Sequence, residues 1–181
     1  MKKLLRFLSL LVALFFFNAC GNNYDFSLNS EFGKVNLKDF SGKKLVVYFG
    51  YTYCPDVCPA TLSLLANELK ELDSKETFLL FISLDPQRDK DINSTNEWLR
   101  YFYPNATALI ADDEKSLAQI TQNYGVIYEK VLLPDSIMRY SVAHSNEVFL
   151  FDEKGKLFNK INDLSKKSLH NSLKAFLNSS E

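Results

Sequence analysis

Two cysteines four residues apart are the part of this sequence best suited to chemistry. Cys54 and Cys58 lie in residues 51–59, between an apolar run that predicts a buried strand and leucines that recur at helical spacing. A thiolate is both a nucleophile and a metal ligand, and the N-terminus of a helix favours negative charge. We therefore expect the thiol pKa to be lowered at this strand-to-helix turn, with both sulfurs in reach of one metal ion or of each other.

A structural disulfide is the alternative use of this pair. The 181-residue chain has three cysteines, and the third, Cys20, stands at the end of the N-terminal apolar run. Two cysteines so close in sequence close almost no loop, so a bridge between Cys54 and Cys58 would gain little entropy. Metal binding and thiol–disulfide exchange are therefore the better interpretations.

A histidine late in the chain is the third candidate. Of the two histidines, His170 falls in the pattern of the closing helix, whereas His144 directly precedes a predicted strand. A cysteine loop between a strand and its helix resembles the thioredoxin-like layout. In such a sheet the loop before this strand lies beside the cysteine loop, and redox-active thioredoxins place a cis-proline there. This chain has no proline after Pro134. A histidine near the site and the lack of a proline favour metal ligation over plain disulfide exchange.

Two thiolates and one imidazole form a soft ligand set. Such a set suits Cu(I), which accepts three ligands, and tolerates Cu(II) if a further ligand is added. Structural zinc takes four protein ligands, and only Cys54, Cys58 and His144 are evident. Catalytic zinc would take three ligands and a water, so zinc is disfavoured and stays open.

Hydrophobic periodicity predicts the elements that position these residues. Strands are expected at residues 44–50, 77–84, 108–111, 147–151 and 156–161. Helices are expected at 59–72, within 92–103, at 114–124 and at 165–177. The polar segment 22–43 predicts a tether that leads into a hairpin. The order of these elements predicts an α/β fold: a central mixed sheet flanked by helices, with an N-terminal hairpin. A cysteine loop between the first core strand and its helix resembles the thioredoxin-like layout.

The start of the chain is typical of an export signal. A basic beginning is followed by an apolar run over residues 7–17, too short for a membrane-spanning helix of roughly 20 residues but typical of a signal h-region. Residues 18–21 then resemble the lipobox of bacterial lipoproteins, in which Cys20 becomes the lipidated first residue. The alternatives are an ordinary signal peptide that leaves Cys20 free, and an uncleaved anchor.

These signals divide the chain into a lipoprotein-type signal peptide at 1–19, a tether at 20–31 and a thioredoxin-like domain at 32–181. We expect the domain to lie on the periplasmic side of a bacterial membrane, held there by a lipid on Cys20. Disulfides persist in that compartment.

Composition and charge exclude several classes of protein. The chain is 46% hydrophobic and 24% charged, which is typical of one globular domain and not of a disordered or collagen-like chain. Beyond residue 19, 18 basic residues face 22 acidic ones, a net charge near −4. Phosphate binding needs clustered Lys and Arg, so nucleic acid is not expected as a partner.

Three motifs together resemble the Sco/SenC family of copper-binding, thioredoxin-like proteins. Residues 48–59 resemble its metal loop, residues 83–89 its Asp-Pro-x-Arg-Asp segment and residues 140–145 its histidine loop. The resemblance covers residues 32–176. The family usually has Asp before the histidine, and this chain has Ala143, which removes a carboxylate that would orient the imidazole or tune Cu(II) binding.

The resemblance implies a copper metallochaperone, which binds and delivers copper and is not an enzyme. Its partner would be the copper-site subunit of a respiratory haem–copper oxidase, and a thiol reductant would keep Cys54 and Cys58 reduced. A thiol–disulfide oxidoreductase that keeps the partner's cysteines reduced is the second interpretation. A peroxidase of the peroxiredoxin kind is the third. That family places Thr three residues before its reactive Cys, where this chain has Tyr51.

Supporting roles around the site also follow from the resemblance. It implies that Asp85 holds Arg88 or orients a ligand; the alternative is a turn that caps the next helix. Asp56 adds negative charge beside the sulfurs, which attracts cations and opposes a lowered thiol pKa. Tyr51 and Tyr53 are expected to pack around the site.

Two further segments lie outside the predicted ligand set. The apolar loop 132–138 is expected to pack on the body, the alternative being a mobile docking surface. Residues 91–95 resemble the acidic N-glycosylation sequon that some bacteria use outside the cytoplasm, with Asn93 as the acceptor.

Overall fold

The computed structural model describes residues 24–74 and 76–179. The predicted signal peptide 1–19, the lipidation candidate Cys20 and the first residues of the tether lie outside the described residues. Among the helices of the described part, none has the length and apolarity to cross a membrane.

A five-stranded mixed sheet forms the centre of the fold. Its strands are β3 (Lys44–Gly50), β4 (Thr77–Ser83), β5 (Ala106–Leu109), β8 (Val148–Phe151) and β9 (Leu157–Ile161), in the order β5-β4-β3-β8-β9. The first three run parallel, whereas β8 is antiparallel to β3 and β9 is antiparallel to β8. The predicted mixed sheet is confirmed, with β5 starting two residues earlier than expected.

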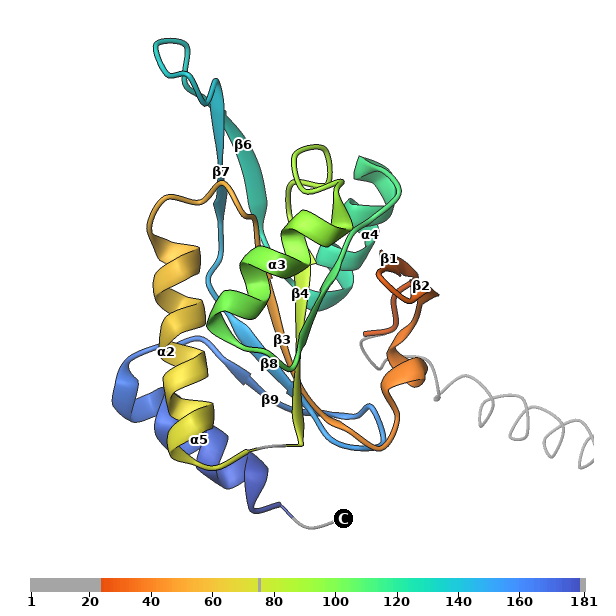
Figure 1. Ribbon diagram of the computed structural model, residues 1–181, viewed down its shortest axis with the longest axis vertical. Helices are drawn as coiled ribbons and strands as arrows, with labels where there is room; N and C mark the ends of the chain where they lie inside the picture. The colour runs from red at the N-terminus through yellow and green to blue at the C-terminus, as the bar shows by residue number, and fades with distance from the viewer. Residues whose placement is uncertain (1–23, 75, 180–181) are drawn as a thin grey trace, which may run out of the picture.

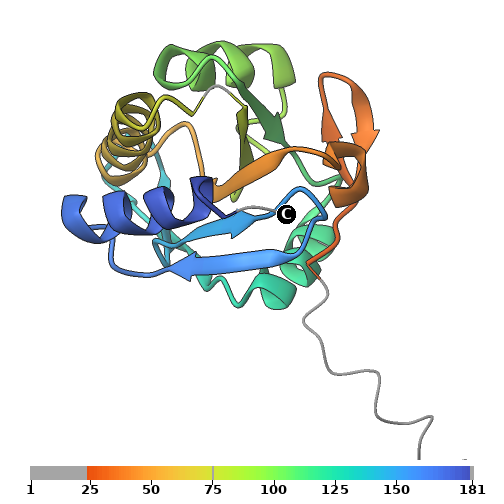
Figure 2. The same cartoon turned by 90° about the horizontal axis from the view of Figure 1, so that it is seen from below.

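Helices cover both faces of this sheet. They are α2 (Val57–Glu71), α3 (Ile92–Phe102), α4 (Glu114–Tyr124) and α5 (Lys166–Leu177). Figures 1 and 2 show α2, α3 and α5 on one face and α4 on the other. Because both faces are covered, β3 and β4 are apolar over nearly their whole length. The largest fully buried aromatic side chains are Tyr48, Phe49, Phe81, Phe149, Phe151 and Phe176.

An N-terminal hairpin precedes the first core strand, as predicted. It pairs β1 (Leu28–Ser30) with β2 (Gly33–Val35), and a 3-10 turn, η1 (Leu37–Phe40), follows it. Asn29 forms an isolated bridge with Ile110, so the hairpin lies beside the β5 edge of the sheet. Leu28 is fully buried, so residues 28–31 of the predicted tether pack on the body.

A second hairpin projects from the body beside the cysteine loop. It pairs β6 (Tyr128–Leu132) with β7 (Tyr140–His144), and Figure 1 shows it extending beyond the end of α2. The sequence analysis predicted no strand at residues 140–144. The prediction that His144 lies in a loop is therefore wrong: it ends β7 and pairs with Tyr128.

The tip of this hairpin stands away from the body. Ile137 is 99% exposed and Leu132 is 76% exposed. The prediction that the apolar residues 132–138 pack on the body is therefore wrong, and their apolar surface faces solvent.

Candidate metal centre

The cysteine loop connects the carboxyl end of β3 to the first turn of α2. Helix α2 begins at Val57, two residues before the predicted start, which places Cys58 inside its first turn. The Cys58 N–H donates to the sulfur of Cys54 at 3.3 Å, so this sulfur accepts from one of the free amides at the helix N-terminus. Cys58 is fully buried and Cys54 is partly buried.

The structure brings Cys58 and His144 together across 86 residues of sequence. The sulfur of Cys58 lies 3.6 Å from Nε2 of His144. On the other side of the ring, Nδ1 lies 2.9 Å from the backbone carbonyl of Ser145 and donates to it. A proton held on Nδ1 leaves the lone pair on Nε2 facing the sulfur, which is the arrangement that a metal-ligating imidazole uses.

Cys54 is less closely placed than the other two candidate ligands. Both cysteines are free thiols, so the alternative of a structural disulfide is not present. Within the described residues, the two sulfurs of Cys54 and Cys58 and the ring nitrogens of His144 do not form a group in which all ligand atoms lie within 4.8 Å of one another. A different group, Glu68, Glu71 and His170, does meet that spacing. Because Cys58 and His144 are 3.6 Å apart, the Cys54 sulfur is the atom that lies outside this spacing.

Burial controls the protonation of the site. It raises the pKa of Cys58 to about 12, because a buried thiolate loses its hydration. The prediction that the helix N-terminus lowers this pKa is therefore wrong for Cys58: desolvation outweighs the helix dipole. Burial also lowers the pKa of His144, which favours the neutral imidazole that binds metals.

Aromatic residues and one glycine shape the space around the Cys58 sulfur. The ring of Tyr51 is buried and packs edge-on against His144, at 6.2 Å between centroids. A methyl group on Gly50 would lie 3.1 Å from the Cys58 sulfur and 2.9 Å from the ring of Phe81. Glycine at position 50 therefore leaves room for the sulfur at the end of β3.

A network around Asp85 holds the hairpin that carries His144. The buried carboxylate of Asp85 accepts from the Tyr140 hydroxyl at 2.9 Å and lies 3.5 Å from Nε of Arg88. Arg88 donates through Nη2 to the carbonyls of Met138 and Tyr140, and its guanidinium stacks 3.5 Å from the centre of the Tyr140 ring. Asp85 thus pairs with Arg88, as the resemblance implied. Its connection to His144 is indirect, because Asp85 and Arg88 contact Tyr140 in the same hairpin. The alternative of an N-cap is wrong, because Asp91 caps α3.

A second buried carboxylate, Asp89, secures the cysteine loop to β4. It accepts from the hydroxyls of Ser83 and Thr52. Burial raises the pKa of Asp89 despite these bonds. The sequence analysis gave no role to Asp89, although it closes the 83–89 motif.

Asn146 ties the segment after His144 to the body. It accepts from the Tyr48 hydroxyl at 3.0 Å, and its amide donates to Thr61 on α2 at 3.3 Å. Nothing in the sequence singles it out, because its partners lie 98 and 85 residues away.

The other predicted site residues lie at the margin. Asp56 is exposed at the N-cap of α2, and its side chain makes no capping bond. Tyr53 is 53% exposed and lies against Arg88, with 5.2 Å between the guanidinium carbon and the ring centre. Asn93 is exposed on α3, whereas Thr95 of the same sequon is buried and donates to the Asp89 carbonyl.

This chain belongs to the SCO1/SenC family, whose model matches residues 18–177. A SCO2-like protein of Rickettsia conorii is 32% identical over 135 residues, which are 73% of this chain. That match spans 65% of the length of the Rickettsia protein.

Solved structures agree in fold. An Arabidopsis thaliana ScoI structure with copper bound superposes with a TM-score of 0.74 at 28% identity, covering 84% of this chain and 96% of that one. A Bradyrhizobium japonicum ScoI structure with copper bound gives 0.69 at 30% identity, covering 84% and 97%. The thioredoxin domain of a Bacteroides vulgatus thiol-disulfide oxidoreductase, at 20% identity, gives 0.57 over 85% of this chain and 94% of that one. The predicted thioredoxin-like α/β fold is confirmed.

Proposed function

We propose that this protein is a copper metallochaperone that binds Cu(I) through Cys54, Cys58 and His144. The observation that carries the proposal is the 3.6 Å approach of a free thiol to the unprotonated nitrogen of a partly buried, neutral imidazole. Two soft sulfurs and one imidazole suit copper. Two solved structures that resemble this chain are described with copper bound.

Loading of the site involves the loss of two thiol protons. Copper itself supplies the driving force, since a coordinated thiol is deprotonated outright. Cys54 is the partly exposed sulfur and Cys58 the buried one, so Cys54 is the entry ligand and Cys58 with His144 the preformed pair. With a further ligand the same set holds Cu(II).

The destination of the copper also belongs to this proposal. The protein works on the periplasmic side of a bacterial membrane, held by a lipid on Cys20, and hands copper to the copper-site subunit of a respiratory haem–copper oxidase. A thiol reductant keeps Cys54 and Cys58 in the dithiol form, because oxidation to a disulfide consumes both sulfur ligands.

Competition against a Cu(I) chelator under anaerobic conditions tests the site. The wild-type chain is expected to hold one Cu(I), the Cys54→Ser/Cys58→Ser double variant none, and His144→Ala to bind more weakly. Ser63→Ala, on the exposed side of the same helix, is the matched control and is expected to bind like wild type. Equal Cu(I) binding by the double cysteine variant would contradict the proposal.

Thiol–disulfide exchange is the second candidate function, favoured by two free thiols on a thioredoxin-like fold. His144→Ala separates the two functions. Copper delivery predicts an oxidase-assembly defect as severe in His144→Ala cells as in Cys58→Ser cells. Normal assembly with His144→Ala and failure with Cys58→Ser would make the protein an oxidoreductase.

A further inference from the structure

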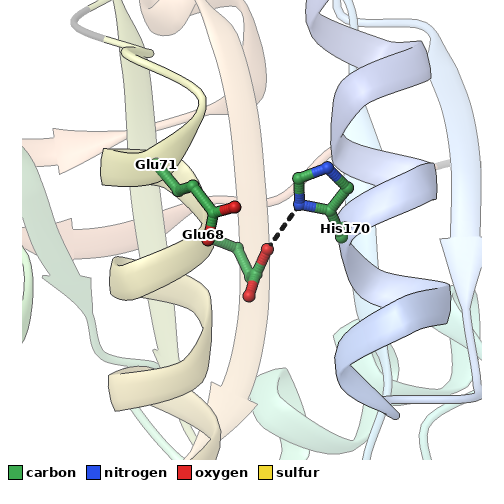
Figure 3. Close-up of side chains that lie close together, drawn as sticks. All are labelled: Glu68, Glu71 and His170. Carbon is green, nitrogen blue, oxygen red and sulfur yellow. Dashed lines mark hydrogen bonds and ion pairs between the residues drawn. The ribbon is translucent and has the colours of Figure 1, made fainter.

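A cluster of ionisable side chains joins α2 to α5, away from the cysteine site. Glu68 and Glu71 stand three residues apart on one face of α2, and His170 faces them from α5 (Figure 3). One ligand atom from each of the three lies within 4.8 Å of the other two. The sequence analysis placed His170 in the closing helix and gave it no role.

Glu68 is the unusual member of this cluster, because it is a carboxylate with only 1% of its surface exposed. Its Oε2 accepts from Nδ1 of His170 at 2.7 Å. Its other oxygen, Oε1, is buried and accepts no hydrogen bond. A buried carboxylate oxygen without a donor is costly, and a cation bound beside it removes that cost.

Among the described residues, a loosely held lysine forms an ion pair with this oxygen. Nζ of Lys166 lies 3.7 Å from Oε1 of Glu68 and 3.8 Å from Oε2 of Glu71. Both separations exceed hydrogen-bond length, and the Lys166 side chain is 71% exposed. Lys166 therefore neutralises the carboxylates from solvent without satisfying Oε1, and it can move aside at little cost.

We propose that Glu68, Glu71 and His170 form a second metal site, which binds a divalent first-row transition ion such as Zn²⁺ or Cu²⁺. One imidazole and two carboxylates are ligands that these ions accept, and water completes the coordination on the open side. The Nδ1 proton of His170 moves to Nε2 or to solvent when the ion takes its place between ring and carboxylate. The ion also crosslinks α2 to α5.

This site is separate from the proposed Cu(I) site. Glu68 lies ten positions after Cys58 in α2, which is about 15 Å along the helix axis. The proposal goes beyond the copper-delivery function, since it uses none of the Cys54, Cys58 and His144 ligands.

The experiment measures Zn²⁺ and Cu²⁺ binding to the full chain carrying Cys54→Ser and Cys58→Ser, so that neither thiolate of the cysteine loop contributes. Equilibrium dialysis is expected to show one ion per chain. Replacing His170 by Asn is expected to weaken binding at least about 10-fold, since losing even a partner of a metal ligand costs about 10–100-fold. Lys166→Met removes the competing cation and is expected to strengthen binding. Glu97→Gln, an exposed change on α3, is the control and is expected to bind like its parent.

Thermal unfolding covers the case in which a His170 variant folds poorly. Zn²⁺ is expected to raise the melting temperature of the double-cysteine parent, because an ion that binds the folded state stabilises it. The half-exposed Glu71→Gln change keeps Glu68 and His170 in place and is expected to reduce this rise. A parent that binds no ion, a melting temperature unmoved by Zn²⁺, or undiminished binding by the folded His170→Asn variant would each overturn the proposal. The cluster would then be an ion pair between helices only.

Discussion

The two cysteines differ in how accessible they are to solvent and reagents. Cys58 is fully buried beneath Gly50 and beside His144, whereas Cys54 lies in the partly exposed loop. Their four-residue spacing is read directly from the sequence, and their position at the start of a helix could be predicted from it. The sequence could not predict that burial outweighs the helix dipole in setting the pKa of Cys58. The burial of this thiol depends on Tyr48, Phe81 and His144, which come from the strands β3, β4 and β7.

Alkylation is expected to distinguish the two thiols. At pH 8 a thiol of pKa about 12 is ionised in about one molecule in ten thousand, so Cys58 is expected to resist iodoacetamide while Cys54 reacts. Modification of Cys58 is expected to rise as the pH increases towards 12. Peptide mass spectrometry measures both sites, and in denaturant both should react equally. Equal labelling of Cys54 and Cys58 in the folded protein at pH 8 would contradict the burial of Cys58.

The neutral imidazole of His144 predicts a pH dependence of stability. Its folded-state pKa lies below the ordinary value of 6.5, because burial disfavours the charged ring. Below pH 6.5 the unfolded chain binds a proton at His144 that the folded chain does not, so stability falls as the pH falls, until the folded pKa is reached.

Urea unfolding at pH 7.5 and 5.5 measures this effect. The His144→Gln variant lacks the titrating ring and is expected to lose less stability than wild type over this interval. An equal loss in both proteins would show that His144 titrates alike in the folded and unfolded chains.

The β6–β7 hairpin is the element that positions the imidazole. It leaves the sheet entirely, and within the described residues its own pairing and the Arg88–Asp85–Tyr140 network hold it, the network acting at the Leu132–Tyr140 pair. The sequence could not predict β7, because its burial alternates irregularly and its partner strand is separated from it by the exposed tip. The strands β3 and β4, by contrast, were predictable within one residue, since a strand buried on both faces is apolar throughout.

Loosening the contact between Asp85 and the hairpin is expected to weaken the site without removing a ligand. Tyr140→Phe deletes the hydroxyl that donates to Asp85 and leaves a buried carboxylate oxygen without that donor. The expected cost in the free energy of unfolding is about 1–3 kcal/mol. Hydrogen exchange of the β6 and β7 amides should become faster, and Cu(I) affinity should fall while both thiols stay titratable.

Tyr101→Phe is the matched control for this change, since Tyr101 is 87% exposed on α3. It is expected to leave stability, exchange and copper affinity unchanged. Unaltered exchange in the hairpin of Tyr140→Phe would show that Asp85 does not hold it.

At the scale of the whole molecule, one end of the sheet carries the candidate metal site and the other end contributes to stability. The carboxyl ends of β3 and β4 carry the cysteine loop and the Asp85 network, as expected for an α/β sheet. The opposite end of β3 begins at Lys44, whose ammonium donates to backbone carbonyls at the end of α5. Stability at this end can therefore be changed without touching the metal candidates.

Lys44 is expected to contribute strongly to stability and nothing to copper binding. Its Nζ donates to the carbonyls of Phe176 and Leu177 at 2.9 Å and of Ser179 at 2.8 Å, which satisfies carbonyls that the end of α5 leaves free. Lys44→Met keeps the buried stem and removes these charged donors. Hydrogen bonds to a charged group contribute about 1.5–3 kcal/mol, so urea unfolding should show a loss in that range.

The control for Lys44→Met is Lys167→Met, which removes an exposed charge on α5 and is expected to alter stability little. The folded Lys44→Met protein should still bind one Cu(I) and still protect Cys58 from alkylation at pH 8, because the altered residue lies at the far end of β3 from the cysteine loop. A change in copper affinity without loss of stability would show that the two ends of the sheet are coupled.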